Sequence, residues 1–285
     1  MRLYSGFRPC LGVGGRPVLG RIVRRVSTSR APRLRQVAVV TRTPAPVEAL
    51  LKASIDVEPG YRYPDVDEWG LGTAFCPVGN DVFEVVFAAV RGTVADRFID
   101  RRGGDTGFIL MVEVTDLPFY RTRVDAAQVR VVHAGDDPEE GRYIELHPKD
   151  TGGTFLELNE PYGPRAGEPD GPWRYTRHFR PGAHRSTLVS GIVGAEIACV
   201  DVHDVAGRWA SILDLPTIDD GADAVIELRG GALRFTPVND ARGPGLTAAT
   251  LRAHDPARVM ADAEARGLLT DDALVVGGLR VDLVG

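Results

Sequence analysis

The chain has 285 residues, with 34 basic and 39 acidic side chains, for a formal net charge of −5. An apolar fraction of 44% is ordinary for a globular protein and excludes a disordered one, and no apolar run approaches the ~18 residues of a membrane-spanning helix. Cys10, Cys76 and Cys199 are scattered and make no disulfide framework, which predicts a reducing, cytoplasmic location.

The charge is unevenly distributed along the chain. Residues 1–47 contain ten Arg and no acidic residue, whereas the other 238 residues carry 24 basic and 39 acidic groups, a net charge of −15. An acidic body disfavours nucleic-acid partners, because their binding surfaces need clustered basic residues. The Arg-rich segment 1–33 resembles a transit peptide, with a disordered tail or residues upstream of the true start codon as alternatives. In each case we expect the fold to begin near Leu34.

The first part of the body predicts a β-α-β-β pattern. The run Gln36–Val40 is typical of a strand, and Val47–Ala53 has apolar residues at helical spacing. Two strands, Leu71–Val78 and Val82–Val90, surround a Gly-Asn-Asp turn, and a further strand is expected within 55–70.

The pattern restarts after a connecting segment, 91–107. The expected elements are a strand at Phe108–Val114, a helix at Leu117–Gln128, and strands at Val129–His133, Tyr143–Leu146 and Thr154–Leu158, with an acidic turn at 135–141. Residues 161–189 are rich in Pro, Gly and aromatic residues. Their apolar residues have neither the spacing of a helix nor the alternation of a strand. Such a long segment predicts either a crossover draped over the surface or a functional lid.

Two further units follow, each a strand, a helix and a hairpin. Their expected elements are Ile192–Val200, Val205–Leu213, Ala224–Leu228 and Ala232–Val238, then Gly245–Ala253, Pro256–Arg266, Leu274–Val276 and Leu279–Val284. The amino-acid sequence repeats as well. Residues 152–160 read GGTFLELNE and residues 277–285 read GGLRVDLVG, each with Gly-Gly, an apolar strand and a carboxylate before Leu. Repeats of about 50 residues define an architecture. We therefore expect an α+β fold of four βαβββ-type units, paired into two domains at 34–160 and 190–285.

Four motifs in the first pair of units resemble the vicinal oxygen chelate superfamily of glyoxalases, bleomycin-resistance proteins and extradiol dioxygenases. They are GNDVFEVV at 79–86, RFIDRRGG at 97–104, VEVTDL at 112–117 and, most specifically, LHPKDTGGTFLEL at 146–158. They are most similar to methylmalonyl-CoA epimerase and glyoxalase-like proteins. The resemblance covers about 34–160, and 190–285 matches in pattern only, as a shorter and divergent glyoxalase-like domain. It implies sheets curled around a cleft that holds a divalent metal ion.

The resemblance also implies a metal shell with one residue from the first and one from the last strand of each unit. By position these residues are Gln36, Glu84, Ile109 and Glu157. The family has His at the first and third of these positions, so half of its shell is replaced. Ile109 cannot bind a metal, and Gln36 offers a neutral oxygen. Gln36, Glu84 and Glu157 thus form a weak all-oxygen site, suited to a hard cation at most. The second pair offers a poorer set, Glu196, about Leu233, about Ala248 and Asp282.

Two interpretations of the cleft stay open, and with them whether the protein is an enzyme. In the first, Glu84 and Glu157 titrate apart and act as acid and base. That chemistry suits an isomerase, epimerase or lyase acting on a small carbonyl or thioester compound, with the group that stabilises the enolate unassigned. In the second, the cleft binds or sequesters a small molecule without chemistry, as in the bleomycin-resistance branch. Whether a divalent metal is bound stays open.

The expected partner is a small molecule, with no nucleic acid and no membrane. Family members form the cleft within one chain or across a dimer, so a homodimer is one of the expected arrangements. His147 is expected to shape a turn and His133 to lie exposed in an acidic loop, while His178 and His184 are candidates for covering the cleft. Asp204 and Asp255 are expected to cap the helices that follow them.

Overall fold

The computed structural model describes residues 31–63, 69–179 and 184–285. The elements of the first half are β1 (Arg33–Thr41), α1 (Pro44–Ile55), β2 (Tyr61–Arg62), β3 (Leu71–Val78), β4 (Asp81–Ala88), α2 (Val94–Arg102), β5 (Thr106–Glu113), α3 (Leu117–Ala126), β6 (Val131–Asp137), β7 (Gly141–Leu146) and β8 (Phe155–Pro161). Most of the predicted tail, residues 1–30, lies outside the described residues.

The elements of the second half follow a short 3₁₀ turn, η1 (Thr176–His178), in the crossover. They are β9 (Val189–Cys199), α4 (Val202–Leu213), β10 (Ile218–Asp220), β11 (Asp223–Leu228), β12 (Gly231–Pro237), β13 (Gly245–Ala253), α5 (Pro256–Ala265), β14 (Val275–Val276) and β15 (Leu279–Val284). None of the helices in the described part of the chain has the length and apolar character needed to cross a membrane.

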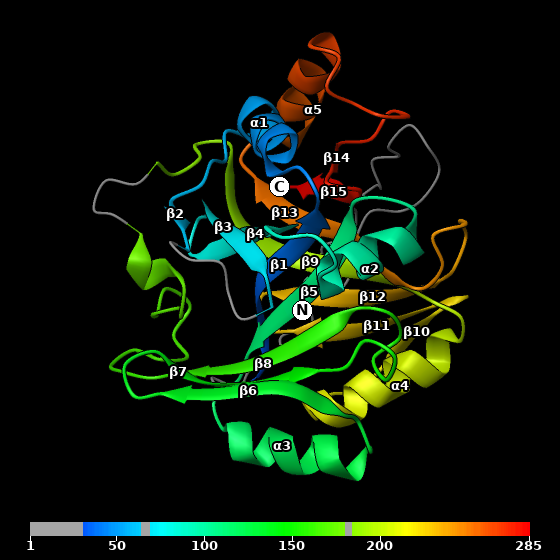
Figure 1. Ribbon diagram of the computed structural model, residues 1–285. Helices are drawn as coiled ribbons and strands as arrows, with labels where there is room; N and C mark the ends of the chain where they lie inside the picture. Colours follow the sequence, from blue (N-terminus) through cyan, green and yellow to red (C-terminus); the bar gives the residue numbers. More distant parts are fainter. Residues whose placement is uncertain (1–30, 64–68, 180–183) are drawn as a thin grey trace, which may run out of the picture.

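The strands form two curled mixed sheets, which confirms the predicted α+β class (Figure 1). The first sheet has the order β2-β3-β4-β1-β5-β8-β7-β6, and the second has the order β10-β11-β12-β9-β13-β15-β14. In each sheet two units meet edge to edge through their antiparallel first strands, β1 with β5 and β9 with β13. Among the described residues the last unit has one strand fewer than the other three, because the third unit contains β10, which the sequence analysis did not predict.

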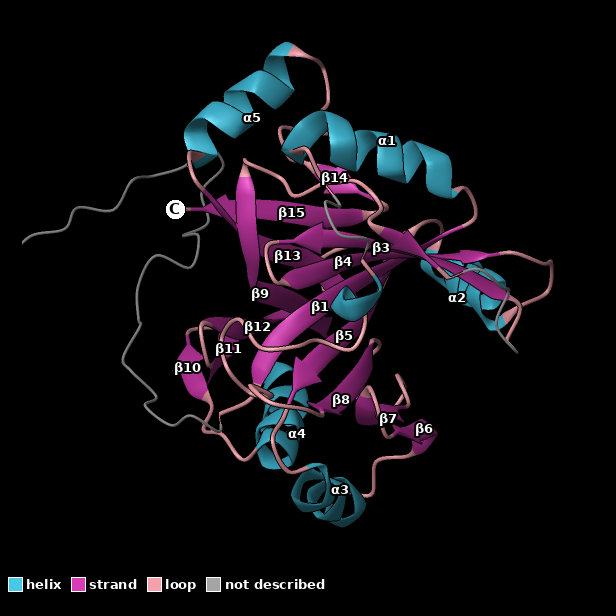
Figure 2. Cartoon of the chain, turned by 90° about the vertical axis from the view of Figure 1, so that its left-hand side faces the viewer, coloured by secondary structure: helices cyan, strands magenta, loops and turns pink. Residues whose placement is uncertain are grey.

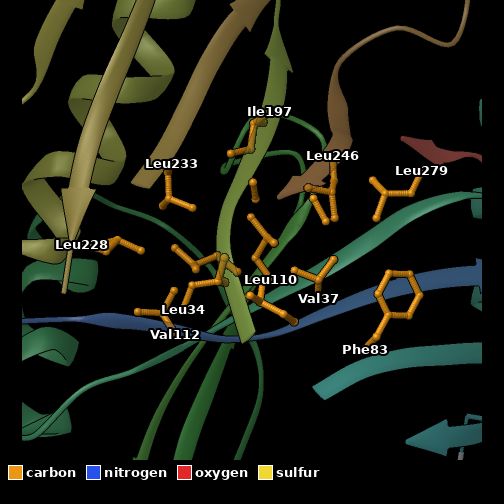
Figure 3. Packing of buried hydrophobic residues seen from close by; sticks show 14 of the residues in the cluster. Leu34, Val37, Phe83, Leu110, Val112, Ile197, Leu228, Leu233, Leu246 and Leu279 are labelled. Atoms are coloured by element: carbon orange, nitrogen blue, oxygen red, sulfur yellow. The ribbon is translucent and has the colours of Figure 1, made fainter. Parts of the chain in front are cut away.

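The two sheets share one hydrophobic core. Val37 of β1 and Leu110 of β5 belong to it together with Ile197 of β9 and Leu246 of β13 (Figure 3). Helices α1 and α5 lie side by side at one end of this layer, and α3 and α4 at the other (Figures 1 and 2). Because successive residues of a strand point to opposite faces, Ala38 and Val40 of β1 line the other face of the first sheet.

We call that other face the cleft face. It carries a second apolar cluster, to which β1, β5, β8, α2 and the crossover contribute Ala38, Ile109, Met111, Phe155, Phe98 and Trp173 among others. The prediction that 91–107 is a plain connection was wrong, because it contains α2. The helix has a full capping box between Thr93 and Asp96, which is a sequence signal for a helix start. Its Phe98 and Ile99 cover one end of the cleft face.

The repeated Gly-Gly pairs have a physical reason in the packing of the sheets. A Cβ on Gly153 would lie 2.3 Å from the carbonyl oxygen of Pro244, and one on Gly278 would lie 1.8 Å from that of Asp105. Both glycines also have positive φ, 106° and 72°. Each pair therefore lets the backbone of one half approach that of the other closely, which a residue with a side chain cannot do.

Two local predictions differ from the structure. The acidic turn expected at 135–141 is shorter, because β6 continues to Asp137 and pairs with β7. The cap of α4 is Asp201, whose side chain accepts from the backbone N–H of Asp204, so Asp204 lies inside the helix. Asp255 caps α5 as predicted, accepting from the N–H of Arg258.

Candidate functional site

The register of β1 and β5 fixes the symmetry of the cleft face. Gln36 lies opposite Met111, and Ala38 lies opposite Ile109. The two strands are thus related by a pseudo-twofold axis, and Ile109 on β5 occupies the position equivalent to that of Gln36 on β1. All four side chains point to the same face, because their positions differ by two along each strand.

The two predicted carboxylates obey the same symmetry. Glu84 on β4 pairs with Ala38, and Glu157 on β8 pairs with Met111. Both glutamates are buried. The structure thus brings Gln36, Glu84 and Glu157 to one face, as the sequence predicted, with Ile109 as the fourth position.

The amide of Gln36 makes one hydrogen bond through its nitrogen and one through its oxygen. Its Nε2 donates to Oε2 of Glu84 at 2.7 Å, and its Oε1 accepts from the indole Nε1 of Trp173 at 2.9 Å. Trp173 comes from the crossover, is 1% exposed and lies 5.1 Å from the guanidinium of the buried Arg35. The crossover therefore reaches the centre of the cleft face.

A third carboxyl group, Glu145, lies beside Glu157 and was missed by sequence reasoning. The two residues are direct partners across the antiparallel strands β7 and β8, so their side chains share a face at close range. Burial, followed by the charges of Glu157 and Glu84, raises the pKa of Glu145 to about 8. The available signal was a glutamate between Ile144 and Leu146, inside an apolar strand.

Glu157 has partners that favour its charged form. Burial raises its pKa, while the positive charge of Arg174 and the amide of Asn159 act in the opposite direction. The amide Nδ2 of Asn159 donates to Oε1 of Glu157 at 2.8 Å. Arg174 and Asn159 thus oppose the effect of burial on the carboxylate of Glu157, whereas every cause acting on Glu145 raises its pKa.

Arg174 is the cation of this site, and it also comes from the crossover. Its guanidinium lies over the ring of Tyr143 at 4.1 Å and near Tyr175 at 5.2 Å. Its Nε donates to Oε2 of Glu140 at 3.1 Å. Burial lowers the pKa of Arg174, but Tyr175, Glu157, Tyr143 and Glu140 raise it above its ordinary value. Its Nη1 is buried without a hydrogen-bond partner among the described residues.

Among the histidines, His147 lies in a turn, His133 on a strand and His178 in the crossover. His147 shapes its turn as predicted, with Nδ1 accepting from the N–H of Lys149. His133 was expected in an exposed loop, but it lies on β6 and contacts the hydroxyl of Tyr143 at 3.2 Å. His178 lies on the cleft side, 2.8 Å from Oε1 of Glu140.

No protein-family model matches the sequence, and no curated protein matches it. Among solved structures, a variant of 4-hydroxymandelate synthase from Streptomyces coelicolor aligns over 84% of this chain and 76% of its own, at 16% identity and a TM-score of 0.61. The Mn(II)-bound glyoxalase from Novosphingobium aromaticivorans aligns over 89% and 82%, at 13% identity and a TM-score of 0.61. Methylmalonyl-CoA epimerase from Mycobacterium tuberculosis aligns over 46% and 88%, at 23% identity and a TM-score of 0.40.

The synthase and the glyoxalase, which align over most of this chain, are members of the vicinal oxygen chelate superfamily. The chain has the vicinal oxygen chelate fold. The resemblance drawn from the LHPKDTGGTFLEL motif is thereby confirmed at the level of the fold.

The residues at the metal positions of the vicinal oxygen chelate fold do not fit a divalent ion here. Ile109 has no donor atom, and the oxygen of Gln36 is taken by the indole of Trp173. Glu84 accepts from Gln36, and Glu157 accepts from Asn159 beside Arg174. In the described part of the chain, no group of three or more His, Cys, Asp or Glu side chains is arranged to hold a metal.

The second vicinal oxygen chelate sheet has an arginine between its two carboxylates. Arg280 contacts Oε2 of Glu196 at 3.1 Å and Oδ1 of Asp282 at 3.0 Å. The position predicted at about Leu233 lies three residues before the equivalent of Glu84. Glu84 pairs with Ala38, two residues after Gln36, and Thr236 pairs with Ala198, two residues after Glu196. Leu233 faces the shared core, and Arg234 pairs with Glu196 across the strands. This sheet is held by ion pairs where the family holds a metal.

Proposed function

We propose that the first domain binds a small carbonyl or thioester compound on its cleft face and transfers a proton without a metal, as an isomerase or epimerase does. The observation that carries the proposal is the pairing of Glu145 with Glu157 across β7 and β8. With a pKa of about 8, Glu145 is protonated at neutral pH, while Arg174 and Asn159 favour the carboxylate of Glu157. One proton is thus shared by two neighbouring carboxyl groups, an arrangement used for acid–base catalysis.

In the proposed reaction, Glu157 accepts the proton on the carbon next to the carbonyl. The electron pair of the broken C–H bond moves to the carbonyl oxygen and gives an enolate. The carboxyl group of Glu145 then returns a proton to that carbon. The sequence had assigned the partner role to Glu84, but Glu84 is engaged by the amide of Gln36, so we assign it to Glu145 instead.

Arg174 is the candidate for stabilising the enolate, a role that the sequence left unassigned. Its buried Nη1 is a hydrogen-bond donor without a partner among the described residues, and its charge acts on Glu157. A preorganised cation beside the atom where negative charge develops is a large source of catalysis.

The test is exchange of the substrate's α-proton in D2O, followed by NMR on a panel of short 2-oxo acids and acyl thioesters. For a compound that exchanges, Glu157→Gln should lower the rate by about 10²–10⁴-fold, and Glu145→Gln should lower it as well. Glu168→Gln is the matched control, because Glu168 is an exposed crossover residue paired with Arg165. Full exchange by Glu157→Gln would refute the assignment.

Sequestration of a ligand without chemistry is the second candidate. It is favoured by the hydrocarbon at Ile109 and by the indole of Trp173 on Gln36, since an apolar cleft face suits binding more than catalysis. Calorimetry on the same panel separates the two candidates. Binding without proton exchange, unchanged by Glu157→Gln, would support sequestration.

A further inference from the structure

The crossover covers the proposed site with a row of aromatic side chains. Trp173 belongs to the same apolar cluster as Ile109. The ring of Tyr175 stacks on Phe75 of β3 at 4.6 Å, and His178 stacks on Tyr61 of β2 at 5.0 Å. We call residues 173–179 the cover. It contacts strands of both units of the first sheet, because Arg174 also lies on Tyr143 of β7.

The cover helps to bury one member of the carboxyl pair. Glu157 is 3% exposed and feels the charge of Arg174, whereas Glu145 is partly exposed. A ligand can therefore contact the carboxylate of Glu157 only if the side chains that bury it, those of the cover included, move.

One carboxylate holds the cover on its outer side. Glu140, in the turn between β6 and β7, accepts from Nε of Arg174 at 3.1 Å and lies 2.8 Å from Nε2 of His178. Its two oxygens thus hold two residues of the cover, four positions apart. Hydrogen bonds to charged groups are stronger than neutral ones, so Glu140 attaches the cover firmly to the β6–β7 turn.

A buried arginine fixes the start of the cover on its inner side. Arg35 stacks on the ring of Trp173 at 5.1 Å and pairs with Asp81 at 3.1 Å. Asp81 in turn accepts from the N–H of Ile192 in β9 at 2.9 Å. This end is anchored in the shared core, whereas Glu140 lies on a hairpin turn at the rim.

We propose that the cover is a gate, with Glu140 as its latch, and that ligands enter when Arg174 and His178 leave Glu140. The identity of the ligand rests on the proposed function, but the opening itself does not. The proposal predicts a closed resting state that opens transiently, and weakening the latch raises the open fraction.

A cysteine placed under the cover reports the opening. Ile109→Cys in a Cys10→Ser background puts a thiol beside Trp173, while Cys76 and Cys199 are buried. Its rate of labelling by a thiol reagent should be far below that of the urea-unfolded protein. Adding Glu140→Gln should raise the rate by about tenfold, the effect of losing one charge-assisted hydrogen bond. His178→Asn should raise it too, and Glu168→Gln should leave it unchanged.

Two outcomes would overturn the gate. One is fast labelling of the introduced thiol in the protein with an intact latch, which would mean that the cleft is open. The other is a rate that neither latch variant changes. Amide hydrogen exchange of the 172–179 peptide in the protein without a reporter cysteine gives an independent reading, and it should speed up in Glu140→Gln. Because neither measurement uses a ligand, an absence of proton exchange would overturn the proposed function alone.

Discussion

Glu145 and Glu157 lie directly opposite each other on β7 and β8, and the charge of Glu157 contributes to the raised pKa of Glu145. Two carboxyl groups on directly paired residues resist ionising together, since the negative charge of the first disfavours deprotonation of the second in a buried site. Their titration is therefore a measurable property of the fold, independent of any substrate.

Stability should fall as the pH rises from about 5 to 8. The pKa of Glu145 is about 8 when folded and 4.5 as a free group, so in this window the folded state binds the proton that the unfolded state has released. The loss is at most about 1.4 kcal/mol per pH unit for this one group. Urea unfolding at several pH values measures it, and Glu145→Gln should flatten the profile. Parallel profiles for the two proteins would contradict the assigned pKa.

The order of the elements could be predicted from the sequence because the apolar periodicity repeats in every unit. Helix α2 was missed because its four core-facing residues, Ala95, Phe98, Ile99 and Arg102, include a charged one. Glu145 was missed because only the register of β7 and β8 brings it to Glu157. The contact between Trp173 and Gln36 joins residues 137 apart in the chain, and no local pattern encodes such a pairing.

Metal ions should leave the melting temperature unchanged, and so should a chelator. At two of the positions that hold the metal in the family that this chain resembles, the chain has Ile109 and Gln36. The amide oxygen of Gln36 accepts a hydrogen bond from Trp173. The double variant Gln36→His, Ile109→His restores imidazole at both positions beside Glu84 and Glu157. We expect Mn²⁺ or Zn²⁺ to raise its melting temperature, because only a site with several donors binds such ions. Scanning calorimetry decides the matter, and stabilisation of the unmutated chain by these ions would contradict the reasoning.

Arg35→Met should destabilise the fold by about 3–5 kcal/mol. Arg35 is fully buried between Asp81 and Glu113, with which it forms ion pairs. Its removal takes from each buried carboxylate one of its two arginine partners, and leaves Asp81 with Arg33 and Glu113 with Arg229. Arg165→Met is the control, since Arg165 pairs with two exposed carboxylates and its loss should have no measurable effect. Urea unfolding at pH 7 gives both values. Equal stability of the two variants would mean that the buried ion pairs contribute little to the folded state.

Gly278→Ala should be more destabilising than Gly230→Ala, although both glycines have positive φ, 72° and 84°. An alanine at either position pays the backbone strain of about 1–3 kcal/mol. At Gly230 the added Cβ meets nothing within 4 Å, whereas at Gly278 it would lie 1.8 Å from the carbonyl oxygen of Asp105. The difference between the two losses of unfolding free energy therefore measures the cost of disturbing the close approach between the β14–β15 hairpin and the first sheet. Urea unfolding of both variants provides it, and equal losses would show that the two sheets can move apart at this point at little cost.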